Sequence, residues 1–229
     1  MKHRSIGYEY LSGKGVEIGA FCEPAPLGKQ CEVSYFDAIT AEEAAEKFPE
    51  IDPAGLVKVE LLGDIDKRGL RDAIAEGSLD FIIANHVIEH VANPIAMLED
   101  MVRAVKRGGV VVLTAPDKRF TFDHERSLTT FDHLREEFEE EVDHVTDEHY
   151  MDFLGHVGKH VFEEPGRDIQ KDVEFVRGRR EHAHVWDSQS FLSFVEAAAS
   201  LLGIEFELLY KSLGEENQIE CFLVMRIAK

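Results

Sequence analysis

Short runs rich in apolar residues recur along the first half of the chain and predict buried strands. Five such runs occupy residues 16–19, 33–36, 57–62, 81–84 and 110–113. The runs 81–84 and 110–113 do not alternate with polar residues, which is typical of strands covered on both faces of a parallel sheet. Because turn or helical patterns separate the runs, the order of elements favours an α/β fold.

Residues 79–116 have the pattern of a complete βαβ unit. Asn93 can cap a helix whose first position is Pro94, where the missing N–H costs nothing. Apolar side chains follow on one face at helical spacing: Ile95, Leu98, Val102 and Val105. Positive charge at Arg103, Lys106 and Arg107 suits a helix C-terminus, and Gly108-Gly109 can end the helix in the left-handed conformation. We therefore expect a helix to residue 107 between two parallel strands, with the chemistry at the strands' carboxyl ends.

Further helices and two late strands complete the predicted core. Thr40 and Glu43 form a capping box that opens a helix ending near Pro49, and a short helix is expected at 66–76. Ser188 is a plausible cap for a helix through residue 202. The strands 206–210 and 219–227, joined through 214–217, predict a C-terminal hairpin at one edge of the sheet.

Residues 117–187 depart from this alternation. They hold eight of the eleven histidines, an acidic run at 136–141 and enough apolar side chains to dock, but no buried-strand pattern. The sequence thus predicts a Rossmann-like, seven-stranded, mostly parallel sheet with helices on both faces, formed by residues 1–116 and 188–229. Residues 117–187 would be a substrate or lid region inserted after the fifth strand.

Composition narrows the classes of function. A formal net charge of −20 argues against nucleic acid as a partner, because phosphate contacts need clustered Lys and Arg. No run approaches the roughly 20 apolar residues of a membrane span. The three cysteines form no CxxC pair and indicate reduced thiols in a cytoplasmic protein. We expect a small-molecule or glycan substrate, and the sequence leaves a homodimer open.

Several motifs stand where the predicted strands end. Glu17-Ile18-Gly19 forms a turn after the first strand, and Asp37 follows at close to the spacing of about 20 residues at which nucleotide-binding folds place an acid on ribose hydroxyls. Together with Asp64, the run DFIIANHVIEHV and the later Gly-Gly, these motifs resemble the class I S-adenosylmethionine-dependent methyltransferases, with the closest likeness to the type 11 and 23 group. The run PDKRFTFD from residue 116 resembles a bacterial subgroup, many of whose members are linked to sugar or glycan modification.

The resemblance implies S-adenosylmethionine as cofactor and a site at the strand ends. Asp37 would bind the ribose hydroxyls, Asp64 and Ile65 would contact adenine, and Asn85 with His86 would border the sulfonium. The full implied set is Glu17, Gly19, Ala20, Asp37, Asp64, Ile65, Asn85 and His86. The first turn lacks the second glycine of G-x-G. This absence argues more strongly against a dinucleotide than against S-adenosylmethionine, because only the dinucleotide has a pyrophosphate that needs close backbone approach.

The motif His86-x-x-Glu89-His90 has several interpretations. It matches one class of zinc peptidases, but those ligands need one continuous helix, and a new cap at Asn93-Pro94 makes that unfavourable. His86, Glu89 and His90 could instead hold a divalent metal. A third interpretation is that Glu89 and His90 only form structural hydrogen bonds that tie the turn to a neighbouring strand.

Histidines also supply the candidate catalytic bases. His86 is the first choice, because it would sit beside the transferable methyl and histidine titrates near neutral pH; His133 and His184 of the lid are reserves. Alternation places His182 and His184 on one side of an extended segment, where they could face a pocket or, with His133 and His149, a metal. Ordinary core or solvated histidines are the alternative.

The charged residues after the fifth strand are candidate substrate ligands. Asp117, Arg119, Asp123 and Arg126 would suit a polar, hydroxyl-bearing acceptor, or would form an internal salt-bridge network that orders the insertion. We therefore expect O-methylation of a small polar molecule or glycan. A non-catalytic S-adenosylmethionine-binding regulatory module and a metal-dependent hydrolase that uses the histidine-rich insertion remain as alternatives.

Overall fold

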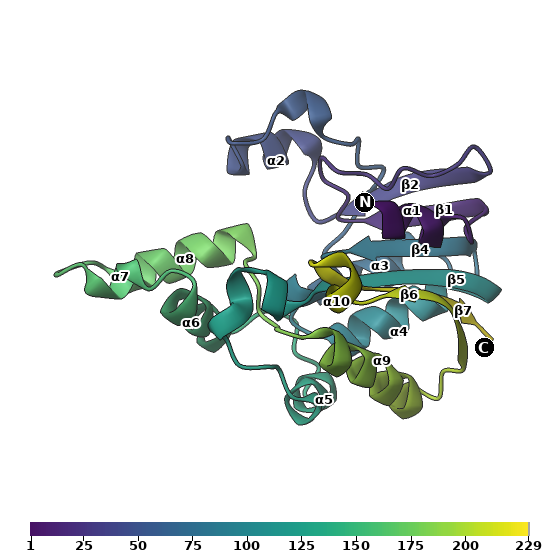
Figure 1. Ribbon diagram of the computed structural model, residues 1–229. Helices are drawn as coiled ribbons and strands as arrows, with labels where there is room; N and C mark the ends of the chain where they lie inside the picture. The colour runs from purple at the N-terminus through teal and green to yellow at the C-terminus, as the bar shows by residue number, and fades with distance from the viewer. Residues whose placement is uncertain (229) are drawn as a thin grey trace.

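The computed structural model describes residues 1–228 and contains one seven-stranded sheet, in the order β3-β2-β1-β4-β5-β7-β6 (Figure 1). All neighbouring strands are parallel except β7, which is antiparallel to both β5 and β6. The strands are β1 (Gly13–Ile18), β2 (Cys31–Asp37), β3 (Leu61–Leu62), β4 (Leu79–Asn85), β5 (Val105–Pro116), β6 (Phe206–Ser212) and β7 (Glu220–Ile227). This arrangement confirms the predicted fold class, including the C-terminal hairpin.

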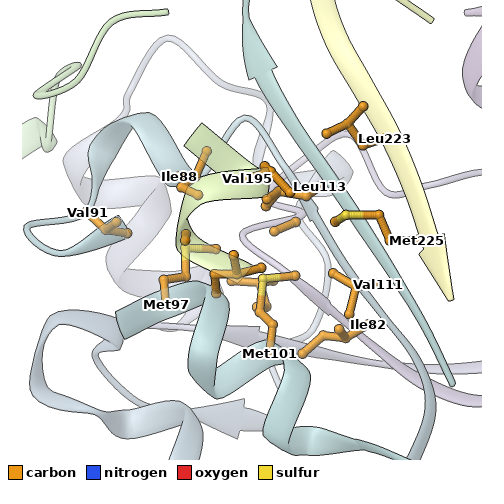
Figure 2. Packing of buried hydrophobic residues seen from close by; sticks show 14 of the residues in the cluster. Ile82, Ile88, Val91, Met97, Met101, Val111, Leu113, Val195, Leu223 and Met225 are labelled. Atoms are coloured by element: carbon orange, nitrogen blue, oxygen red, sulfur yellow. The ribbon is translucent and has the colours of Figure 1, made fainter. Parts of the chain in front are cut away.

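The central strand β4 is apolar from Phe81 to Ala84 because each face of the sheet has its own core. Ile82 and Ala84 belong to the larger apolar cluster, whereas Phe81 and Ile83 belong to a smaller cluster on the other face. The larger cluster lies under α3 (Gly69–Ala73), α4 (Pro94–Ala104) and α9 (Ser188–Leu202). Figure 2 shows this packing between α4, α9 and the sheet, with the labelled side chains Ile82, Met97, Met101, Val111, Leu113, Val195, Leu223 and Met225 among them.

The second face is covered more thinly. It lies under the short helix α1 (Lys2–Tyr8) and the loop 19–30, through Tyr8, Leu11, Ala25 and Leu27. Within the described chain, no helix connects β1 to β2. Pro24 and Pro26 in this connection account for it, because proline removes a helical hydrogen bond. Tertiary contacts of a loop thus take the place of a covering helix.

Two element boundaries differ from the sequence expectation. Helix α4 ends at Ala104 rather than residue 107, because Val105 already pairs with Leu79 of β4 and residues 106–109 form a bulge opposite Asp80. Gly108 has φ +80° and makes that bulge possible. Strand β3 is two residues long rather than six, because the N–H of Val57 bonds to the carbonyl of Phe21 instead of to a sheet neighbour.

The predicted helix caps are mostly confirmed. Thr40 and Glu43 form the capping box of α2 (Ala41–Lys47), and Asn93 caps α4 with Pro94 at the first position. Helix α9 begins at Ser188, but its cap is Asp187, which accepts from the N–H of Ser190. A short helix, α10 (Gly214–Asn217), lies between the two hairpin strands.

Residues 117–187 form four helices and a small core of their own. The helices are α5 (Phe131–Glu139), α6 (Asp147–His156), α7 (His160–Glu163) and α8 (Ile169–Arg179). Helices α6 and α8 pack around Tyr150, Leu154 and Val173 and, with α7, project to one side of the sheet (Figure 1). Leu134 of α5 belongs to the main core. None of the helices in residues 1–228 is long and apolar enough to cross a membrane.

Candidate active site

A cleft of about 330 Å³ lies at the carboxyl ends of β1, β2 and β4. This volume falls within the range of about 300–1,000 Å³ typical of small-molecule sites. Its walls include four residues of the predicted cofactor set, Gly19, Asp37, Ile65 and His86. The cleft therefore lies where a parallel α/β sheet is expected to bind its ligand.

Gly19 is required at the turn that follows β1. Its φ is +63°, and a Cβ on it would lie 2.8 Å from Cγ2 of Val87, closer than side-chain carbon atoms approach. Its N–H bonds to the carbonyl of Phe36 at 3.0 Å, so the ladder between β1 and β2 continues to the first residue of the turn. The absent side chain leaves the backbone of this turn as the wall of the cleft.

Asp37 presents a largely buried carboxylate to the cleft. Burial raises its pKa, while the backbone N–H groups of Ile39 and Ala38 act in the opposite direction. Ile39 N donates to Oδ1 at 3.3 Å. A partly desolvated carboxylate at the end of the second strand is well suited to accept hydrogen bonds from ligand hydroxyl groups.

The other four residues of the predicted cofactor set do not line the cleft. They are Glu17, Ala20, Asp64 and Asn85. Strand alternation turns Glu17 to the opposite face, where its carboxylate oxygens accept from Ala25 N at 3.1 and 3.0 Å and hold the loop 19–30. Asn85 Nδ2 donates to Tyr8 Oη at 3.0 Å and to Glu17 at 3.3 Å.

Asp64 is turned toward the inserted region. Its carboxylate accepts from Asp66 N at 3.1 Å and from Arg180 Nη2 at 2.5 Å. The position of Asp64 along the chain was predicted, but the ion pair with Arg180 occupies the group expected to contact adenine. Ile65, next to it, does line the cleft.

His86 joins the cleft to a buried carboxylate that the sequence did not reveal. Its backbone has φ +54°, a left-handed conformation that costs energy for a residue with a side chain. Its Nε2 lies 2.6 Å from Oε2 of Glu220, the first residue of β7. The carboxylate of Glu220 is fully buried and is also hydrogen-bonded to Arg4 and His3. Burial acts to raise the pKa of Glu220, but hydrogen bonds from Arg4 and His86 hold it well below its usual range, so this carboxyl is ionised.

Two arginines of the inserted region close one side of the cleft. Arg179 and Arg180 both line it; the guanidinium of Arg179 lies 4.7 Å from the ring centre of Phe48 and donates to Glu50 at 2.7 Å. Arg180 adds the contact with Asp64. Neither arginine is among the sequence predictions, although the basic cluster Arg177-Gly178-Arg179-Arg180 is a signal on its own.

The four candidate substrate ligands form an internal network instead. Asp117 is buried and accepts from Arg119 Nε at 2.9 Å and from Ser188 Oγ at 2.7 Å. Arg126 is also buried and donates to Asp123 at 2.9 Å, to Asp152 at 2.8 Å and to the carbonyls of residues 182 and 183. In the part of the chain that the structure describes, none of Asp117, Arg119, Asp123 and Arg126 lines the cleft. The geometry favours the alternative in which these charges order the insertion.

The candidate metal ligands and bases are distributed differently from the expectation. Glu89 and His90 come together with His182, not with His86, and the ligand atoms of these three lie within 4.8 Å of one another. His90 Nδ1 contacts the carbonyl of Arg180 at 2.5 Å, and His182 Nδ1 contacts Asp123 at 2.6 Å. Neither of the reserve bases, His133 and His184, is among the described residues that line the cleft.

The model of a methyltransferase domain family matches residues 15–198. The chain belongs to this methyltransferase domain family. Its membership confirms the expected class I S-adenosylmethionine-dependent methyltransferase type, while the subgroup with the PDKRFTFD motif stays a prediction. None of the curated proteins matches the chain in sequence.

Similar solved structures have low sequence identity to this chain, and one of them has a TM-score above 0.5. A Rhodobacter sphaeroides protein named "Putative Zn-dependent Alcohol Dehydrogenases" has TM-score 0.54 and 14% identity, over 98% of this chain and 88% of that one. A Thermotoga maritima SAM-dependent methyltransferase, described as a possible histamine N-methyltransferase, has TM-score 0.49 and 17% identity, over 100% and 88%. The CurJ carbon methyltransferase has TM-score 0.48 and 14% identity; the match covers 97% of this chain but only 51% of that longer one.

Proposed function

We propose that this protein transfers a methyl group from S-adenosylmethionine to a hydroxyl oxygen of a small polar molecule, such as a sugar or glycan unit. His86 acts as the general base, and Glu220 orients it. The observation that carries the proposal is the hydrogen-bonded pair His86–Glu220 at the wall of the cleft. The family match does not favour a metal-dependent hydrolase or a non-catalytic binding module.

The residues of the cleft fit this cofactor. Asp37 offers a carboxylate for ribose hydroxyls, and the Gly19 turn offers bare backbone for close approach. Apolar side chains of Phe21, Ile65 and Val87 provide flat, dry surface for an adenine ring. When bound, S-adenosylmethionine supplies a methyl group made electrophilic by the positive charge on its sulfur.

The orientation of His86 suits a base. Because Glu220 is ionised, it accepts from Nε2, so the lone pair of the neutral ring is on Nδ1. Nδ1 can then take the proton of an acceptor hydroxyl, and the Glu220 carboxylate stabilises the imidazolium that forms. This is the division of roles between base and orienting carboxylate seen in catalytic triads.

The same pair supports oxygen rather than nitrogen as the acceptor atom. A neutral amine attacks without prior loss of a proton, whereas a hydroxyl is a weak nucleophile until a base removes its proton. The resemblance of the run from residue 116 to glycan-linked methyltransferases supports the sugar class. A strongly acidic chain supports a substrate other than nucleic acid.

Turnover measurements on purified variants test the proposal. With a panel of sugars, hydroxy acids and amines as acceptors, His86→Ala should lower kcat by about 10²–10⁴-fold while the dissociation constant for S-adenosylmethionine stays nearly unchanged. His3→Ala is the matched control, because His3 contacts the same Glu220 at 2.6 Å but does not line the cleft. Methylation of amines alone, or loss of cofactor affinity with turnover per complex intact in His86→Ala, would contradict the proposed roles.

A further inference from the structure

Four side chains from three separate elements of the inserted region converge on one point. His133 and Glu137 stand one turn apart on α5, His149 comes from α6, and His184 comes from the segment that leads to α9. His149 Nε2 lies 3.0 Å from Glu137 Oε1, and His133 Nε2 lies 3.1 Å from the same oxygen. The two histidine Nε2 atoms are 3.3 Å apart, and His184 Nε2 is 3.7 Å from Glu137 Oε2.

Hydrogen bonds alone cannot satisfy this cluster. A neutral imidazole nitrogen carries either one proton or one lone pair. If His133 and His149 bond to each other through Nε2, the nitrogen that accepts cannot also donate to Glu137; if both donate to Glu137 Oε1, two donor nitrogens crowd one oxygen at 3.3 Å from each other. Within residues 1–228, no hydrogen bond of good geometry reaches either ring nitrogen of the fully buried His184, whose ring lies near the backbone of Val91, and Glu137 Oε2 has no partner. Such buried unpaired groups are costly and rare.

A metal ion at the centre would bind one nitrogen of each of the three imidazoles and the carboxylate of Glu137, and the second nitrogen of His184 would be left to the nearby backbone of Val91. Zinc binds histidine nitrogen and carboxylate oxygen at about 2.0–2.2 Å, and tetrahedral geometry then separates neighbouring ligand atoms by about 3.3–3.5 Å. The contacts of 3.0, 3.1 and 3.3 Å among Glu137 Oε1, His149 and His133 are close to that separation, and the four ligand atoms all lie within 4.8 Å of one another. Three imidazoles suit zinc, whereas magnesium and calcium prefer oxygen ligands.

We propose that His133, Glu137, His149 and His184 form a zinc site with a structural role. Four protein ligands fill a tetrahedral shell and leave no open position for chemistry. The side chain of His133 is 43% exposed, so the ion can enter from solvent, while the other three ligands are largely buried.

The proposed site would fasten the inserted region to the turn that carries the cleft residues. The N–H groups of Ala183 and His184 both bond to the carbonyl of Glu89, in the turn after β4. On α5, the carbonyl of Glu137 accepts from Asn93, the cap of α4. A zinc ion would therefore cross-link α5, α6 and the segment around His184 directly behind that turn. This role does not depend on the proposed methyl transfer.

Metal titration of the full-length protein tests the site. After treatment with a chelator, calorimetry with zinc should detect one tight equivalent, and cobalt(II) should give the intense visible absorption of a tetrahedral complex. Glu137→Gln, which keeps the size of the side chain, and His184→Ala should each weaken zinc binding by more than about tenfold, since loss of even an outer-shell partner costs about 10–100-fold. His124→Ala, an exposed histidine outside both candidate groups, should bind like the parent.

Other results would overturn the proposal. One is the absence of a tight zinc equivalent in the parent protein, and another is a pale cobalt spectrum of six-coordinate type. A third is loss of binding in His90→Ala but not in Glu137→Gln, which would assign the ion to the group Glu89, His90 and His182. Far-ultraviolet circular dichroism of each metal-free variant separates loss of a ligand from failure to fold.

Discussion

Two groups of buried polar side chains meet at the segment 182–184 and differ in how well they are paired. In the first group, Arg126 binds Asp123, Asp152 and two backbone carbonyls, and Asp123 also binds His182. The second group includes His184, two residues further along the same segment, which faces Glu137 and makes no hydrogen bond of good geometry through its ring nitrogens within the described chain. The first group is held by bonds between protein atoms, whereas the second is the group for which we propose a bound zinc ion. Burial alone therefore does not distinguish structural polar residues from candidate ligand-binding ones. The distinguishing property is how completely their polar atoms are hydrogen-bonded within the protein.

The paired group should be the most sensitive to mutation. Arg126→Met removes the central cation and leaves Asp123 buried with only His182 to pair with, so we expect a loss of about 3–5 kcal/mol in the free energy of unfolding. Urea unfolding at neutral pH measures it. Arg135→Met is the matched control: its guanidinium is largely exposed beside Asp132 and Glu139, so it should lose no more than about 1 kcal/mol. Equal losses in the two variants would remove the distinction between paired and exposed charge.

Asp66 is an intermediate case, with one good hydrogen bond and a distant cation. Its carboxylate accepts from Ala92 N at 2.8 Å and lies 3.8 Å from Arg180, and burial raises its pKa to about 6. Because the folded protein binds this proton more tightly than the unfolded chain does, protonation stabilises the fold below about pH 4, and that stability is lost as the pH rises to about 6. Asp66→Asn stays neutral, so it should become more stable than the parent by up to about 3 kcal/mol at pH 8.

The pH dependence of that difference is the deciding measurement. Urea unfolding of Asp66→Asn and of the parent should give similar stabilities near pH 4, and the gap should open between about pH 4 and 6. Asp132→Asn, at an exposed position of α5, should show no such gap. A constant difference at all pH values would mean that the ionisation of Asp66 is not its cause.

The sequence predicts the fold well because the signals of its core are local. The apolar runs of β4 and β5, the capping box at Thr40 and the Asn93-Pro94 cap all act within a few residues. The errors occur where a tertiary contact outweighs the local pattern. Val105 leaves its helix because it pairs with Leu79, a contact that helical periodicity cannot reveal.

The sequence predicts which stretches of the chain form the site, but not the direction in which each side chain points. Gly19, Asp37 and His86 stand at strand ends and line the cleft as expected, whereas Glu17, two residues before Gly19, faces the other side of the sheet. Glu220 was missed because it reaches His86 from 134 residues away, and only an acid at the start of the apolar strand β7 marks it.

The most direct test of the account is a calorimetric titration with S-adenosylmethionine and S-adenosylhomocysteine, on the parent protein, Asp37→Ala and Asp72→Ala. The account predicts one site in the parent and a dissociation constant raised about 10–150-fold in Asp37→Ala, the loss of about 1.5–3 kcal/mol expected when a charged hydrogen-bond acceptor is removed. Asp72→Ala, an exposed change on α3, should bind like the parent. No binding to the parent, or unchanged affinity in Asp37→Ala, would contradict the claim that this cleft holds the cofactor.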